Sequence, residues 1–117
     1  MVNELRRKED FDALLERSKA RPVLIYKHST QCGISEDAFE RFQAFMRASP
    51  DVEAGVVLVL EDRPVSNAIE ERLGLLHESP QAILIENGRP VWNTSHRAIT
   101  EESLRQAFAG RRKPSSN

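Results

Sequence analysis

Short apolar runs alternate along the chain with longer segments in which apolar residues recur at helical spacing. The apolar runs have the length of buried β-strands and lie at 23–27, 56–60 and 82–86, with a shorter one at 91–93. Helical spacing of apolar positions predicts helices at 10–18, 33–48, 64–73 and 101–109. The pattern therefore predicts strands and helices that follow one another in turn.

Turn and cap residues lie where this assignment needs them. Pro64 suits the first turn of its helix, and Gly74 suits a C-terminal cap. Asn87 and Gly88 form a strong two-residue hairpin signal, because that turn needs positive φ at both positions. Thr100 is a favourable N-cap. The strands at 82–86 and 91–93 should therefore pair as a hairpin.

The order of elements predicts the fold class. Strands joined by crossover helices run parallel and the hairpin adds an antiparallel pair, so we expect an α/β protein with a mixed sheet sandwiched by helices. A chain of 117 residues fits one domain. We place this domain at 1–110 and a flexible polar tail at 111–117.

Composition excludes several classes of function. The charges nearly cancel, with 17 Lys+Arg against 18 Asp+Glu, which favours neither a nucleic-acid partner nor a membrane surface. No apolar run approaches the about 20 residues that a membrane span needs, and the N-terminus has no signal-peptide core. The three histidines and one cysteine do not have the spacing of a metal site. We expect a cytoplasmic protein with no bound cofactor.

The only cysteine, Cys32, lies between the strand predicted at 23–27 and the helix predicted at 33–48. A lone cysteine forms neither an intrachain disulfide nor a dithiol pair. At a strand-to-helix turn, unpaired backbone N–H groups favour the nucleophilic thiolate. The turn alone leaves a second interpretation open, because free cysteine is often a small buried core residue.

Polar residues surround Cys32 on both sides. Lys27 and His28 precede it, and a cation nearby would lower the pKa of a thiol, although a solvated strand end is an equally simple interpretation. Hydroxyl and amide groups that could bind the sulfur or an incoming thiol follow on Thr30, Gln31 and Ser35. Their alternative role is turn and cap chemistry.

Four segments carry a resemblance to a known family. They are Lys27-His28-Ser29-Thr30, Cys32-Gly33-Ile34-Ser35, Arg63-Pro64-Val65-Ser66-Asn67 and His77-Glu78-Ser79-Pro80-Gln81. Together they resemble the monothiol bacilliredoxins, which have a thioredoxin-like fold, and the likeness runs from about residue 10 to residue 108. One position departs from the family pattern, because Gly33 stands where the family usually has proline.

The resemblance implies a thiol–disulfide oxidoreductase that removes bacillithiol from S-thiolated proteins. Cys32 would be the catalytic residue, bacillithiol the co-substrate, and an external thiol or a second redoxin the partner that resolves the adduct. The alternative is a non-catalytic thioredoxin-like module or redox sensor that uses the groove near Pro80. The pH dependence of Cys32 alkylation distinguishes a reactive thiol from a passive one.

The resemblance also implies substrate-binding residues distant from Cys32 in the sequence. In thioredoxin-like proteins the proline before the third main strand is cis, which predicts a cis Ser79–Pro80 bond here. The backbone of Ser79 would then pair with an extended substrate. Arg63 lies between a strand and a helix, at the same sheet edge as Cys32 if the strands are parallel, and could bind a carboxylate of the small thiol. An ordinary loop and helix start is an equally good interpretation of this segment.

Overall fold

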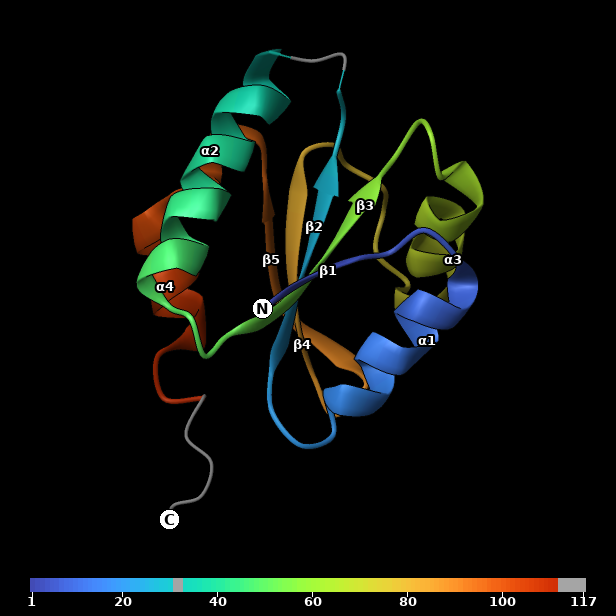
Figure 1. The fold of residues 1–117 in the computed structure, drawn as a ribbon, viewed down its shortest axis with the longest axis horizontal. Helices are drawn as coiled ribbons and strands as arrows, with labels where there is room; N and C mark the ends of the chain where they lie inside the picture. The colour runs from blue at the N-terminus through green and yellow to red at the C-terminus, as the bar shows by residue number, and fades with distance from the viewer. Residues whose placement is uncertain (31–32, 112–117) are drawn as a thin grey trace.

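The computed structural model describes residues 1–30 and 33–111 of the chain. The elements, in chain order, are β1 (Val2–Glu4), α1 (Lys8–Arg17), β2 (Val23–His28), α2 (Gly33–Ala48), β3 (Glu53–Leu58), α3 (Arg63–Leu73), β4 (Gln81–Glu86), β5 (Arg89–Ser95), a 3₁₀ turn (His96–Ala98) and α4 (Glu101–Phe108). The expected class is confirmed, because strands and helices build one mixed α/β sheet structure (Figure 1).

The five strands form one sheet in the order β1-β3-β2-β4-β5. β1, β3 and β2 are parallel, whereas β4 runs antiparallel to β2 and β5 antiparallel to β4. β2 is central, and Val23 to Lys27 are all buried, as expected for an apolar strand covered on both faces. The ends of β2 and β3 therefore meet at one edge of the sheet, as predicted.

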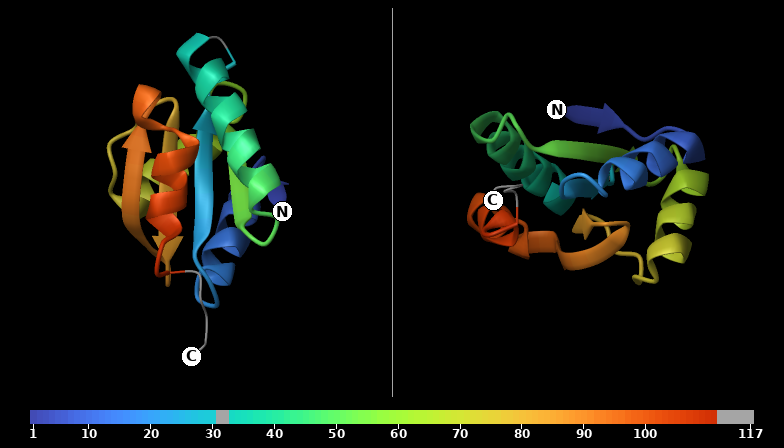
Figure 2. Two further views of the ribbon diagram at one scale, coloured as in Figure 1. Left: turned by 90° about the vertical axis from the view of Figure 1, so that its left-hand side faces the viewer. Right: turned by 90° about the horizontal axis from the view of Figure 1, so that it is seen from below.

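The helices cover the two faces of the sheet in pairs. α2 and α4 lie on one face, and α1 and α3 lie on the other (Figures 1 and 2). Because successive strand residues point to opposite faces, Leu24 and Tyr26 face α2 and α4, whereas Val23 and Ile25 face α1 and α3. This alternation divides the apolar interior into two cores.

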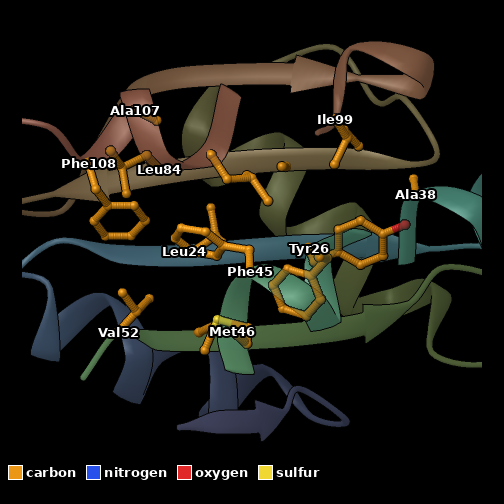
Figure 3. Close-up of a cluster of buried hydrophobic side chains, with 14 residues drawn as sticks. Leu24, Tyr26, Ala38, Phe45, Met46, Val52, Leu84, Ile99, Ala107 and Phe108 are labelled. Carbon is orange, nitrogen blue, oxygen red and sulfur yellow. The ribbon is translucent and has the colours of Figure 1, made fainter. Parts of the chain in front are cut away.

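The α2/α4 core is rich in aromatic side chains (Figure 3). Phe42 is 1% exposed and stacks on Tyr26 with ring centroids 4.9 Å apart. Phe39 continues this stack, with its ring centroid 5.9 Å from that of Phe42. The aromatic stack holds α2 against the central strand.

The α1/α3 core depends on one glycine. A Cβ atom at Gly55 of β3 would lie 2.8 Å from side-chain atoms of Leu14 and Leu5. Both leucines are fully buried. A larger residue at this position would have to displace these buried side chains, so the close packing at this point of β3 favours glycine.

The predicted caps and turns are confirmed. Gly74 ends α3 with φ 69°, and Thr100 caps α4 by accepting a hydrogen bond from the Ser103 N–H. Asn87 and Gly88 have φ 55° and 77° in the β4–β5 hairpin. These positions need the left-handed backbone region or a side-chain acceptor, which is why local sequence identifies them.

Three assignments need correction. β1 and the 3₁₀ turn were not predicted, and β3 was predicted at 56–60, whereas the strand begins at Glu53 and ends at Leu58. Residues 53–55 include a charged residue and a glycine, and they are held as a strand by pairing with β1 and β2 on both sides. The predicted tail lies outside the described residues from 112 onward, whereas Arg111 forms a salt bridge with Glu86.

Candidate functional site

The ends of two parallel strands and the loop before β4 bring most of the predicted site residues to one sheet edge. Thr30 follows β2, Arg63 follows β3, and Ser79 precedes β4. The Ser79–Pro80 peptide bond is cis, which confirms the predicted geometry. Two predicted residues, the catalytic Cys32 and Gln31, lie outside the described residues.

Ser35 ties the first turn of α2 to the end of β2. Its hydroxyl oxygen accepts a hydrogen bond from the Ser29 N–H at 2.9 Å and lies 3.0 Å from His28 Nδ1. Its carbonyl accepts a hydrogen bond from the Tyr26 hydroxyl at 3.0 Å. Ser35 is fully buried, so these bonds fix both ends of the segment that contains Cys32.

The environment of His28 favours a neutral imidazole. The ring stacks on Phe39 with centroids 4.4 Å apart. Burial lowers the pKa of His28 below its ordinary value, although Glu36 and Glu61 act in the opposite direction. The hydroxyl proton of Ser35 is available to Nδ1, which fits a neutral ring with its own proton on Nε2. His28 therefore offers a hydrogen-bond donor and not a full charge at neutral pH.

Lys27 is not the solvated strand end that the sequence allowed. Its side chain is 1% exposed, and it lies on the α1/α3 face of β2, opposite His28. Burial lowers the pKa of Lys27 to about 8, although Glu70 and Glu78 favour its charged form. The lysine therefore belongs to the interior and does not extend into solvent beside the Cys32 segment.

Lys27 joins β2 to the loop before β4 through Gln81. These two residues are partners in the β2–β4 register, and Lys27 Nζ donates to Gln81 Oε1 at 3.1 Å. The same oxygen accepts from the Glu78 N–H at 3.4 Å, and Gln81 Nε2 donates to the Leu76 carbonyl at 3.4 Å. This buried network sets the position of the loop that carries Ser79.

Lys27→Met should stabilise the protein at pH 7 by about 1–2 kcal/mol, because an apolar side chain of similar length removes a buried charge. In the wild type, the folded state releases the Lys27 proton near pH 8 and the unfolded state near 10.5. The unfolded state binds more protons between these values, so wild-type stability should rise with pH across that window.

Urea unfolding at pH 7 and pH 9.5 measures both effects. Lys27→Met should lack the part of the rise that Lys27 contributes. Lys19→Met is the matched control, because that lysine is exposed and its removal should leave the pH dependence unchanged. Equal pH dependence in the wild type and Lys27→Met would show that the lysine is not a buried cation.

A cavity of about 430 Å³ lies between the start of α3, the end of β2 and the loop before β4. We call it the α3-side cavity. Arg63, Ser66, Asn67 and Glu70 of α3 line one wall, and Ser29, His77 and Ser79 contribute the other polar groups. Two predicted site residues, Arg63 and Ser79, thus line the same cavity.

The other predicted residues lie apart from this cavity. Thr30 donates a hydrogen bond to Glu61 at 3.1 Å, and Pro80 is buried beneath the loop. His28 lines a separate cavity of about 340 Å³ on the other side of β2, beside Phe39 and Val56. Ser66, Asn67 and Glu70 were not predicted as site residues, although their i, i+3, i+4, i+7 spacing with Arg63 predicts one polar helix face.

The fold and the arrangement of these segments define a thioredoxin-like protein. The chain belongs to the monothiol bacilliredoxin family, because the profile of the family described as monothiol bacilliredoxin BrxC matches residues 3–104. Together with an oxidoreductase-type structural neighbour, this membership supports a thiol redox function.

Solved structures show the same architecture. A thioredoxin-fold protein provisionally described as an oxidoreductase is 33% identical, with TM-score 0.82 over 91% of this chain and 92% of that chain. Fasciola hepatica thioredoxin is 19% identical, with TM-score 0.77 over 94% of this chain and 99% of that chain. Nicotiana alata thioredoxin NaTrxh is 16% identical, with TM-score 0.77 over 96% of this chain and 93% of that chain. The two thioredoxins show the fold alone.

Within residues 1–30 and 33–111, no helix is long and apolar enough to cross a membrane. In the same part of the chain, no group of three or more His, Cys, Asp or Glu side chains comes together around a possible metal position.

Proposed function

We propose that this protein is a monothiol oxidoreductase of the bacterial cytoplasm that removes bacillithiol from S-bacillithiolated proteins. One observation carries the proposal: in a chain of the monothiol bacilliredoxin family, the only cysteine immediately precedes α2. The backbone N–H groups of a helix start favour a thiolate, which is the nucleophile of thiol–disulfide exchange.

The reaction has two exchange steps. The Cys32 thiolate attacks the bacillithiol sulfur of the mixed disulfide, the old S–S bond breaks, and the substrate cysteine leaves as a thiolate. Cys32 then holds bacillithiol in a new disulfide. A thiolate from outside the chain attacks the bacillithiol sulfur, the S–S bond to Cys32 breaks, and Cys32 leaves as a thiolate while bacillithiol departs in a disulfide with the attacking thiol. A second redoxin could supply the external thiol.

Residues around Cys32 would assist these steps. A neutral His28 can donate a hydrogen bond through Nε2 to a sulfur that gains negative charge, and Ser35 holds the ring in place. Thr30 and Gln31 belong to the same segment and would contact the incoming thiol. The backbone of Ser79 would pair with the protein substrate beside Pro80. A Cβ at Gly33 would meet no atom within 4 Å, so packing leaves room there for the proline usual in the family.

Intact-mass spectrometry tests the proposal. The reduced protein, incubated with a bacillithiolated model protein and no other thiol, should gain the mass of one bacillithiol on Cys32. Parallel incubations with glutathionylated and cysteinylated substrates compare the small thiols. A protein that stays unmodified with every substrate would instead support a non-catalytic binding module or redox sensor.

A further inference from the structure

The α3-side cavity contains a buried hydroxyl group that lacks a partner among the described residues. The Ser79 Oγ atom is buried and has no hydrogen-bond partner among the described residues. Ser66 is 3% exposed and lines the same cavity. Buried hydroxyl groups in native proteins are nearly always satisfied, so the unpaired Ser79 hydroxyl on this cavity indicates that a ligand or water completes its bonding.

Positive charge lies at the end of the α3-side cavity where α3 begins. Arg63 begins α3, is exposed, and forms no salt bridge with a described residue. The first turn of α3 contains no acidic residue, and the Asp62 side chain makes no cap hydrogen bond. The positive end of the helix dipole is therefore not offset by an acidic residue inside the first turn, and it adds to the guanidinium charge.

The cavity wall formed by α3 differs in charge between its two ends. Arg63, Ser66, Asn67 and Glu70 are spaced i, i+3, i+4 and i+7, so they form one stripe along the helix. A rise of 1.5 Å per residue places Glu70 roughly 10 Å along the axis from Arg63. Glu70 already accepts a hydrogen bond from the His77 N–H at 3.3 Å. The stripe thus has a cationic end suited to an anion and an acidic end that repels one.

The cavity also lies beside the segment that carries the reactive residue. Ser29, which lines it, is three residues before Cys32 in the sequence, and Ser79 is the residue before the cis proline. Its volume of about 430 Å³ is within the range of small-molecule sites. A group bound there could therefore belong to a molecule whose sulfur reacts at Cys32.

We propose that the α3-side cavity binds a carboxylate of the small thiol, with Arg63 and the Ser66 hydroxyl as its direct partners. The proposal rests on the proposed function, because it assigns the specificity of the same exchange reaction. A carboxylate accepts bidentate hydrogen bonds from a guanidinium and further bonds from hydroxyl groups, which is the donor set at the Arg63 end. Ser79 supplies a third donor on the opposite wall.

A matched pair of disulfides tests this assignment. Dithiodipropionic acid and its diamide have nearly the same shape, and only the acid carries carboxylates. The second-order rate of adduct formation on Cys32, followed by intact mass, should be about 10-fold or more higher for the acid in the wild type. Arg63→Gln should remove this preference, and Ser66→Ala should reduce it several-fold. Arg47→Gln removes an exposed arginine near the far end of α2 and should keep the preference.

Equal rates for acid and diamide in the wild type, or an equal slowing of both by Arg63→Gln, would overturn the assignment. NMR titration of the Cys32→Ser variant with 3-(methylthio)propionate and its amide measures binding to the cavity without any reaction at residue 32. Saturable shifts of the Ser66 and Ser79 amides with the acid alone support the site, and their absence overturns it. If the wild type forms no adduct with either disulfide, the proposed function fails, and the titration still decides whether the cavity binds carboxylates.

Discussion

Replacing Cys32 with serine should reduce the removal of bacillithiol from a model protein to the rate seen without any enzyme. Serine differs from cysteine by one atom, but its hydroxyl does not form disulfides, and the chain has no second thiol to replace it. The measurement is the loss of bacillithiol mass from the substrate over time, with an external thiol present in every sample.

The fold of the variant provides the control. Cys32→Ser should keep the far-UV circular dichroism spectrum of the wild type, and its free energy of unfolding should stay within about 1 kcal/mol of the wild-type value, since most conservative single changes cost little. Gln43→Ala is a second control, because its exposed side chain on α2 lies outside the candidate site and its loss leaves the thiol in place. Should Cys32→Ser act as fast as the wild type, the oxidoreductase proposal fails and the binding-module alternative replaces it.

Phe42→Ala should lower the free energy of unfolding by about 3–5 kcal/mol. Phe42 is 1% exposed and stacks on Tyr26, so truncation leaves a cavity between α2 and the central strand. Small domains are stable by only about 5–15 kcal/mol, so this single change removes a large share of the total. Urea unfolding at 25 °C, followed by circular dichroism, measures it.

The same substitution should also loosen the segment around Cys32. The Tyr26 hydroxyl donates to the Ser35 carbonyl, and Tyr26 is held by the ring of Phe42. Gln43→Ala is the matched control, because its side chain is exposed on the same helix and its loss should cost less than about 0.5 kcal/mol. A loss below about 1 kcal/mol for Phe42→Ala would contradict the packing described for this core.

The sequence predicts most of the architecture because strong local signals agree with the fold. The apolar run at 23–27 identifies the central strand, and Asn87-Gly88 identifies the hairpin that follows β4. β1 has no such signal, because it is three residues long and gains its strand conformation from pairing with β3. Glu53 is likewise held in β3 by pairing with Val23 of β2, which a local pattern does not reveal.

The candidate site could be predicted only in part. Parallel strand ends predict that Arg63 lies at the edge of the sheet where β2 ends, and the resemblance predicts the cis bond before Pro80. The burial of Lys27 could not be predicted, because its polarity suggests solvent, and its partner Gln81 is 54 residues away in the sequence. The hydrogen bond between His28 and Ser35 depends on side-chain geometry at a helix start, and residue types alone do not predict that geometry.

The resolution of the Cys32 adduct tests the central claim most directly. Purified adduct should be stable for as long as no thiol is added, because no second cysteine in the chain can displace bacillithiol. Added thiol should then regenerate the free protein, at a rate that rises linearly with the thiol concentration and is followed by intact mass. Release of bacillithiol without added thiol, or at a rate independent of its concentration, would contradict a monothiol mechanism.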